Sequence, residues 1–299
     1  MQPLASFRAD LLNQLPQPLL CVDVGARWGA DSTLLLLKER AKLLCFDPDE
    51  AECARLQAQH PISEVEYVPL ALSSDGRELR LTLTREAACS SIFEPLPALY
   101  EHYPALEVIV PELAVTVPST SLDEYLEGRD LGKPDLLKLD TQGSELDILR
   151  GSINSLSAAC MIDVEVECNP IYRGQTLFGD VDVFLRAHGF SLWRLPLLVH
   201  YAPANFLCAE TPLQVVSTPP ERREEANPGN GQLFWAQAHY VRTECLVADE
   251  RRIAAPLARR AAVIASAYGY WDLALMVLAK CGDTRHEASA LRDLLTAAR

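Results

Sequence analysis

The segment 21–30, Cys-Val-Asp-Val-Gly-Ala-Arg-Trp-Gly-Ala, constrains the fold most, because an apolar run meets a glycine turn there and a helical pattern follows over 30–40. Gly25 and Gly29 can take backbone angles that other residues avoid, so a ligand can approach the main chain directly. The first amides of the helix would point at that ligand. The segment therefore predicts a strand–turn–helix unit with a ligand site at its turn.

A second acidic signal follows at the spacing of a nucleoside-binding βαβ unit. Residues 43–46 form another apolar run, and Asp47 comes 22 residues after Gly25 (47 − 25), where such units place the acid that accepts from ribose hydroxyls. The pattern D-x-G-x-x-x-G lacks the glycines of a dinucleotide fold, and its leading Asp23 would repel a diphosphate but suits an ammonium group. We expect a nucleoside that carries an amino acid, although a tight turn without any ligand stays an alternative.

Composition excludes several other classes. With 299 residues, 49% hydrophobic and 23% charged, the chain has the balance of a soluble globular protein, and no apolar window approaches a membrane span. The net charge of −14 disfavours nucleic acid as a partner and favours a neutral or cationic small molecule or a sugar. Nine scattered cysteines without a C-x-x-C pair indicate free thiols in a reducing cytoplasm, and the N-terminus lacks a signal-peptide pattern.

The alternation of apolar strands with helical patterns predicts an α/β fold with a doubly wound, mostly parallel Rossmann-like sheet. A short helix over 4–15 precedes the first strand. We expect strands at 19–24, 42–47, 65–70, 135–139, 160–167 and 190–195, and helices at 30–40, 49–59, 143–157 and 178–188.

Three further segments complete the predicted organisation. Residues 1–216 form the main domain, and 78–117 within it carries β patterns that predict an inserted element, either a lid over the substrate pocket or an extension of the sheet edge. Residues 217–232 are rich in proline, glycine and charge and predict a linker. Residues 233–299 are rich in alanine and leucine and predict a helical extension, which packs on the main domain or, alternatively, mediates a homo-oligomer.

The second strong segment is 134–151, where a strand ends at Asp140, a turn passes through Gly143, and Glu145 stands in the first turn of a helix. The carboxyl ends of parallel strands meet at one edge of a sheet, and ligands bind there. We therefore expect Asp23, Asp47 and Asp140 to converge on one cleft.

These segments together resemble the FkbM family of class I S-adenosylmethionine-dependent methyltransferases, over about residues 19–195. The resemblance is carried by the D-V-G-A turn with Gly29, by F-D-P-D at 46–49, by A-L-S at 71–73, and above all by K-L-D-T-Q-G-S-E at 138–145. Shorter matches stand at 90–91, 121–124, 164–167, 170–172 and 189–190.

The resemblance implies an O-methyltransferase that acts on a hydroxyl of a sugar, glycolipid or natural product, with S-adenosylmethionine as the methyl donor. Arg27 stands where the family usually has a small polar residue, and it is a candidate to pair with the methionine carboxylate. The residues that would bind the cofactor are Asp23, Gly25, Ala26, Arg27, Gly29, Asp47, Pro48, Ser73 and Asp140.

Methyl transfer to a hydroxyl requires alignment, exclusion of water and a general base. The catalytic candidates are Asp140, Glu145 and Glu167, and Glu165 shares a strand face with Glu167. As an alternative, Glu145 is a carboxylate that the helix dipole favours at the start of a helix. The alternative for Glu165 and Glu167 is that they lie on a solvated face of an edge strand.

Two uses of the polar residues after the fifth strand stay open. Asp140 with Glu167 or Asn169 would suit Mg²⁺, although the spacing does not require a metal. Tyr172, Arg173 and Gln175 are candidates for hydrogen bonds to a sugar-like acceptor.

Two rival functions remain at this stage. One is a nicotinamide-dependent oxidoreductase, which the missing glycine disfavours. The other is a catalytically silent binding or assembly protein that keeps the cofactor fold and works through its C-terminal helices.

Overall fold

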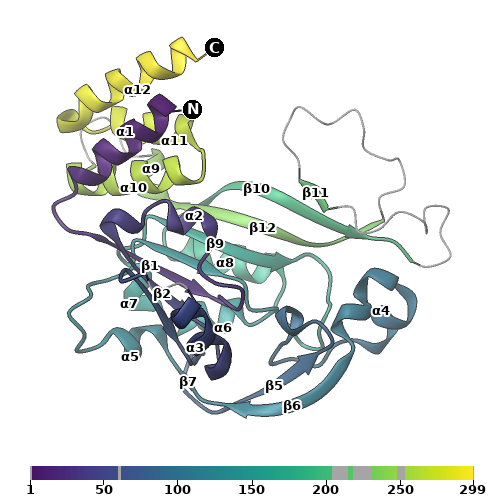
Figure 1. Ribbon diagram of the computed structural model, residues 1–299. Helices are drawn as coiled ribbons and strands as arrows, with labels where there is room; N and C mark the ends of the chain where they lie inside the picture. The colour runs from purple at the N-terminus through teal and green to yellow at the C-terminus, as the bar shows by residue number, and fades with distance from the viewer. Residues whose placement is uncertain (1, 60–61, 204–214, 218–230, 248–252, 299) are drawn as a thin grey trace.

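The computed structural model describes residues 2–59, 62–203, 215–217, 231–247 and 253–298, so most of the predicted linker lies outside the described residues (Figure 1). A central sheet has the strand order β11-β10-β12-β9-β8-β1-β2-β3. Its parallel strands are β1 (Leu19–Val24), β2 (Ala41–Phe46), β3 (Val65–Val68), β8 (Leu136–Leu139) and β9 (Met161–Glu167). The antiparallel strands are β10 (Phe190–Tyr201), β11 (Val215–Ser217) and β12 (Gln232–Arg242). The predicted mostly parallel α/β sheet is confirmed.

Strand β12 corrects the prediction that 233–299 is entirely helical. It lies inside the sheet between β9 and β10, and the helices of the extension begin only with α9 (Thr243–Val247). Phe234, Ala236 and Ala238 are buried and alternate with more exposed residues, which is the period of a strand, and the segment is buried on both faces from Ala238 to Val241. The alanines gave this segment a helical composition, but the two-residue period decides its structure.

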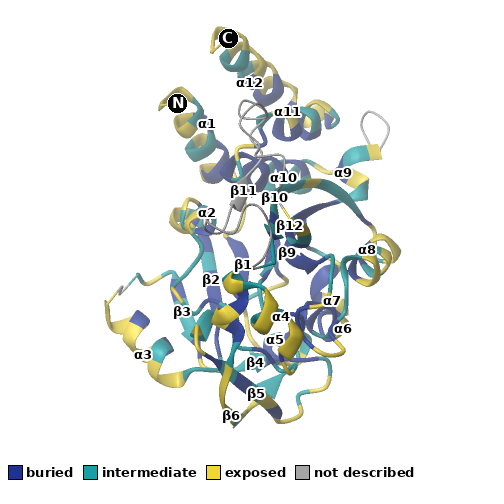
Figure 2. Ribbon diagram, turned by 90° about the vertical axis from the view of Figure 1, so that its right-hand side faces the viewer, coloured by how far each residue is buried: buried dark blue, intermediate teal, exposed yellow. Residues whose placement is uncertain are grey.

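Helices cover both faces of the sheet. One face packs against α5 (Leu122–Leu126), α6 (Glu145–Arg150), α7 (Ile153–Leu156) and α8 (Phe178–Ala187). The other packs against α1 (Gln2–Asn13), α2 (Ser32–Leu35), α10 (Ala255–Ala267), α11 (Trp271–Ala279) and α12 (Arg285–Ala297). Figure 2 shows the buried strands between these layers, with the two termini close together above the sheet. Helix α3 (Glu50–Gln59) packs beside β3.

Two predicted helices are shorter than expected. The segment 30–40 forms only α2 and a 3₁₀ turn, η1 (Lys38–Arg40), and 143–157 is divided into α6 and α7 around Gly151. Cys21, Cys45 and Cys160 are free, as predicted for the cysteines, and lie buried in the core.

The inserted β element is confirmed as an antiparallel pair, β5 (Leu79–Thr84) with β6 (Pro111–Val117). It forms a sheet of its own and does not extend the central one. Its connection holds η2 (Ala87–Cys89), α4 (Pro97–His102) and η3 (Pro104–Ile109), and it is flanked by the short pair β4 (Ala71–Leu72) and β7 (Ser119–Thr120).

The C-terminal helices pack on the main domain, as expected. Arg260 of α10 donates to Asp135 at 2.6 Å, next to the bond of 2.9 Å from the Leu20 amide to the same carboxylate. A turn, η5 (Gly282–Thr284), joins α11 to α12. A homo-oligomer through these helices stays a prediction.

Candidate active site

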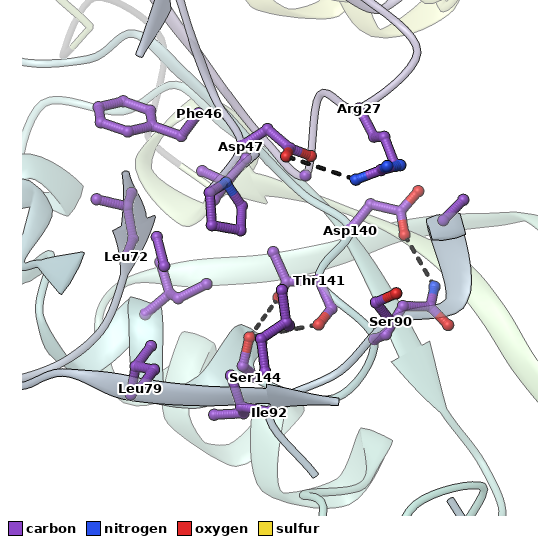
Figure 3. Close-up of a pocket in the computed structure, with 18 of the residues that line it drawn as sticks. Arg27, Phe46, Asp47, Leu72, Leu79, Ser90, Ile92, Asp140, Thr141 and Ser144 are labelled. Atoms are coloured by element: carbon purple, nitrogen blue, oxygen red, sulfur yellow. Dashed lines mark hydrogen bonds and ion pairs between the residues drawn. The ribbon is translucent and has the colours of Figure 1, made fainter. Parts of the chain in front are cut away.

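A pocket lies at the carboxyl ends of β1, β2 and β8, where the sequence predicted a cleft (Figure 3). Gly25, Arg27, Asp47, Pro48 and Asp140 line it. The opposite wall comes from the insertion, including Leu79, Leu81, Ala87, Ala88, Ser90 and Ile92. The insertion therefore encloses the pocket, as the lid interpretation expected.

The glycine turn after β1 is packed tightly between its neighbours. Gly25 has φ +87°, and a Cβ there would stand 1.9 Å from the carbonyl oxygen of Asp140. The amides of Gly25 and Ala26 donate to the Phe46 carbonyl at 2.9 and 3.1 Å. The turn is thus fixed against the ends of β2 and β8.

The amides after this turn bond within the protein, which corrects the expectation that they point at a ligand. The Ala30 amide donates to the Tyr67 hydroxyl at 3.2 Å, and the Asp31 amide donates to Asp23 Oδ2 at 2.8 Å. Gly29, with φ +105°, donates its amide to the Ala26 carbonyl at 2.9 Å. The amides of the turn are thus used by other groups of the protein. Because α2 has only four residues, it does not present a helix N-terminus to a ligand.

Asp23 lies behind the turn, and we therefore correct its expected contact with an ammonium group. Its side chain is 1% exposed, and Oδ1 accepts from Lys138 Nζ at 3.2 Å while Oδ2 accepts from the Asp31 amide. Burial raises the pKa of Asp23, and the Lys138 ammonium opposes that shift. Asp23 fixes the turn from behind.

Asp47 stands at the predicted place on the pocket wall. Its Oδ1 accepts from the Asp49 amide at 2.8 Å, and burial raises its pKa. Arg27 lies beside it, with Nη1 4.0 Å from Asp47 and Nη2 3.1 Å from Asp49. The guanidinium is thus engaged with the acids at the end of β2, and its predicted pairing with a methionine carboxylate would require it to leave them.

Asp140 is the most accessible of the predicted catalytic carboxylates. Its side chain is 37% exposed and lines the pocket, with Lys138 Nζ at 4.0 Å. Gln142 Nε2 donates to Asp140 Oδ1 at 3.2 Å and to Glu165 Oε1 at 2.9 Å. One amide therefore orients the pocket carboxylate and connects it to the buried glutamate.

Gln142 was missed as a site residue by the sequence reasoning. It has φ +58°, the only positive φ of a non-glycine residue in the described part of the chain. The Tyr172 hydroxyl lies 3.0 Å from its side-chain oxygen, and the Ser91 hydroxyl donates to its carbonyl at 2.7 Å. A strained, fully bonded glutamine at a pocket indicates functional use. Its place between Asp140 and Gly143 was the available signal.

Glu145 is not placed for the catalytic role predicted for it, and its carboxylate instead bonds the loop that precedes α6. It is 1% exposed and does not line the pocket, and its carboxylate accepts from the Thr141 amide at 2.7 Å and from the Gly143 amide at 3.0 Å. The Thr141 hydroxyl donates to it at 2.9 Å. Glu145 therefore holds the loop that carries Gln142.

Glu165 and Glu167 are buried, so the solvated edge face is wrong. They are 5% and 2% exposed, because β12 covers the side of β9 that the sequence left open. Burial, together with nearby carboxylates such as Asp140 and Glu145, raises the pKa of both glutamates well above the usual value of 4.5. Glu167 does not line the pocket.

The raised pKa of Glu167 predicts that its contribution to folding stability depends on pH, and Glu167→Gln should remove that contribution. Between pH 4.5 and the raised pKa, the folded state keeps a proton that the unfolded state releases, so the contribution of Glu167 to stability is fully present below pH 4.5 and is lost as pH rises. The limiting slope is about 1.4 kcal/mol per pH unit. We expect the variant to gain stability relative to wild type at pH 8 but not at pH 4.5, measured by urea unfolding. A gain that is equal at both pH values would contradict the assignment.

Three other candidates have internal roles. Ser73 lies outside the pocket lining, and its hydroxyl bonds Ser119 at 2.8 Å. The Tyr172 hydroxyl donates to the Cys89 carbonyl at 2.7 Å, and Gln175 Oε1 accepts from the Ile171 amide at 2.7 Å. Tyr172 and Gln175 therefore support the site from within and do not face an acceptor.

The metal alternative finds no further support. Among the residues that the structure describes, no group of three acidic, histidine or cysteine side chains is placed to hold an ion. The Asn169 amide donates to the Leu233 carbonyl at 2.7 Å.

Within the residues that the structure describes, no helix is both long and apolar enough to cross a bilayer.

The lining of the pocket fits a nucleoside that carries an amino acid. Asp47 offers an acceptor to ribose hydroxyls, Phe46, Leu72 and Ile148 offer apolar walls to a base, and Asp140 offers a carboxylate to a cationic group. Fold and pocket together define an α/β enzyme with a nucleoside-type cofactor at the carboxyl edge of its sheet.

Comparison with known proteins identifies the family. Residues 23–192, more than half of the chain, match the Methyltransferase FkbM domain. The chain therefore belongs to the FkbM methyltransferase family and is an S-adenosylmethionine-dependent methyltransferase.

A curated relative is the 2-O-methyltransferase NoeI of Sinorhizobium fredii, 26% identical over 169 residues, which are 55% of this chain and 69% of that protein. A solved FkbM methyltransferase from Methylobacillus flagellatus shares 14% identity with a TM-score of 0.39, covering 75% of this chain. This chain spans only 43% of that protein's length. A magnesium protoporphyrin IX methyltransferase from Synechocystis is also 14% identical, with a TM-score of 0.37. The match covers 81% of this chain and 78% of that protein. The family assignment rests on the domain match.

Proposed function

We propose that this enzyme transfers the methyl group of S-adenosylmethionine to a hydroxyl of a small molecule, a sugar, glycolipid or other natural product. The observation that carries the proposal is the shared pocket of the β1 turn, Asp47 and Asp140, enclosed by the insertion. The curated relative NoeI is a 2-O-methyltransferase, which favours an oxygen acceptor.

Cofactor binding is assigned to the residues of the pocket wall. Gly25, Arg27 and Pro48 surround Asp47, which would accept from the ribose hydroxyls. Ala26 and Gly29 act through the shape of the turn, and Asp23 acts through its bond to the Asp31 amide.

Catalysis is assigned to Asp140 as the general base. The bound cofactor supplies a methyl group on a positively charged sulfur, which needs no further activation. With the cofactor held at the pocket wall, Asp140 would take the proton of the acceptor hydroxyl as its oxygen receives the methyl group, and S-adenosylhomocysteine would be left as the product. Gln142 orients this carboxylate, and Glu145 holds the loop. Glu167, although predicted as catalytic, is buried outside the pocket lining and has no assigned part in the reaction.

The acceptor lies, in this proposal, against the insertion. Leu79, Leu81 and Ile92 give that wall an apolar surface, and the Ser90 hydroxyl is the polar group among them. An apolar wall near a carboxylate base excludes water, which would otherwise compete as the acceptor.

Asp47→Asn tests the ribose contact. The change keeps an oxygen for the Asp49 amide but removes the charge, so S-adenosylhomocysteine, the demethylated product, should bind roughly 10- to 100-fold more weakly by calorimetry. Asp49→Asn is the matched control, because Asp49 also pairs with Arg27 but lies outside this pocket. Equal losses in both variants would contradict the contact.

A methyl-transfer assay with a panel of sugars and polyketides tests the reaction itself. Transfer from labelled S-adenosylmethionine to an acceptor hydroxyl is expected. Tight binding of S-adenosylhomocysteine with no transfer to any member of the panel would favour the silent binding protein, and binding of NAD alone would overturn the proposal.

A further inference from the structure

A row of polar side chains crosses the central sheet beneath the C-terminal helices. Asp23 of β1, Lys138 of β8, Asp163 of β9 and His239 of β12 are successive partners in the strand registers. Partners in register point to the same face of a sheet. The two aspartates and the histidine are at most 5% exposed.

One end of the row holds the cofactor turn. Lys138 Nζ donates to Asp23 at 3.2 Å, and the same carboxylate accepts from the Asp31 amide at 2.8 Å. This ammonium comes from a residue 115 positions away in the sequence, because the cation of the turn itself, Arg27, pairs with Asp47 and Asp49.

The other end of the row is held by the extension. Asp163 accepts from His239 Nε2 at 3.1 Å, from the Tyr268 hydroxyl at 2.8 Å, and from Gln237 Nε2. The Tyr270 hydroxyl bonds His239 Nδ1 at 2.6 Å. Tyr268 and Tyr270 come from the corner between α10 and α11, which lies over this part of the sheet (Figure 1).

Lys138 therefore stands between two buried carboxylates. A buried carboxylate that loses a donor recruits the nearest cation, because an unpaired charge in the interior is costly. With Asp163 satisfied by Tyr268, His239 and Gln237, the ammonium stays with Asp23. With Asp163 short of a donor, Lys138 is drawn toward β9, and Asp23 loses its partner.

We propose that the α10–α11 corner is part of the cofactor site, with Tyr268 as a positioning residue that keeps Lys138 on Asp23 and so fixes the turn 25–31. The extension then acts on the methyl-transfer pocket from the opposite side of the turn. This inference rests on the proposed cofactor role of the turn, but its effect on the Asp31 amide is independent of any ligand.

Tyr268→Phe is the test, with Tyr240→Phe as the matched control. Each removes one hydroxyl that donates to an aspartate, since Tyr240 bonds Asp182 at 3.0 Å on the other face of the sheet. We expect faster hydrogen exchange of the Asp31 amide in ligand-free Tyr268→Phe only. We also expect S-adenosylhomocysteine to bind about tenfold more weakly in that variant.

The double variant Asp163→Asn with Tyr268→Phe separates positioning from packing. Without the charge on residue 163, Lys138 returns to Asp23, so Asp31 protection and cofactor affinity should recover to near wild-type values. No recovery, or equal effects of Tyr268→Phe and Tyr240→Phe, would overturn the inference. If Asp31 protection falls as expected while wild type binds no S-adenosylhomocysteine, the proposed cofactor site fails and the coupling along the row stands.

Discussion

Gly25→Ala should abolish cofactor binding and cost about 3–5 kcal/mol of folding stability, the sum of a strained backbone and a steric overlap. The added Cβ would meet the Asp140 carbonyl oxygen at 1.9 Å and its carbon at 2.9 Å. Backbone atoms cannot rotate away as a flexible side chain can. The ends of β1 and β8 would have to separate, which breaks the bond of 3.0 Å from the Asp140 amide to the Val24 carbonyl.

Gly174→Ala is the matched control for this variant. Gly174 has φ +78°, close to the φ +87° of Gly25, but an added Cβ there meets no atom within 4 Å. It should cost only about 1–2 kcal/mol, the strain of a left-handed residue with a side chain. Chemical unfolding and calorimetry with S-adenosylhomocysteine measure both effects. Equal losses of stability in the two variants would show that strand contact at Gly25 is unimportant.

The glycine turn and the acidic residues around the pocket could be predicted from the sequence. Gly25, Asp47 and Asp140 were all found from local patterns, because each follows an apolar strand and parallel strands end at one edge. The sheet then brings these three positions into one pocket without any further information. The inserted pair β5 and β6 was also predictable, since a two-residue period identifies a strand locally.

The predictions that were wrong concern segments whose structural partners are distant in the sequence. Residues 233–242 were grouped with the alanine- and leucine-rich helices that follow them, but the segment pairs as a strand between β9 and β10. The burial of Glu165 and Glu167 follows from the same strand. The face of β9 that was expected to be solvated is interior, because of a strand pairing that cannot be predicted from either segment alone.

The roles of Asp23 and Gln142 were out of reach for a related reason. Asp23 has the right place for a ligand, and its engagement depends on Lys138, which is identified as a neighbour only through the register of β1 and β8. Gln142 is recognised as a hub only when Asp140, Glu165 and Tyr172 are seen around it. Side chains at a strand end can be predicted to meet, but which of them faces the pocket is decided by the hydrogen bonds.

Asp140→Asn should lower kcat by about 10²- to 10⁴-fold, the usual contribution of a positioned general base. The amide has nearly the shape of the carboxylate, and its oxygen can still accept from Gln142 Nε2, so the loop 140–145 keeps its bonds. It cannot take up the proton of the acceptor hydroxyl.

Binding of S-adenosylhomocysteine distinguishes a base from a cofactor contact at this position. If Asp140 is the base, the dissociation constant changes less than about threefold while kcat falls, because the interaction is made in the transition state. If Asp140 instead binds the cofactor's ammonium group, affinity falls and kcat at saturation is preserved, which would remove Asp140 from the chemistry. Asp180→Asn, an exposed carboxylate at the start of α8, should change neither quantity. A fall in kcat at constant affinity therefore assigns the proton to the one predicted catalytic carboxylate that faces the pocket.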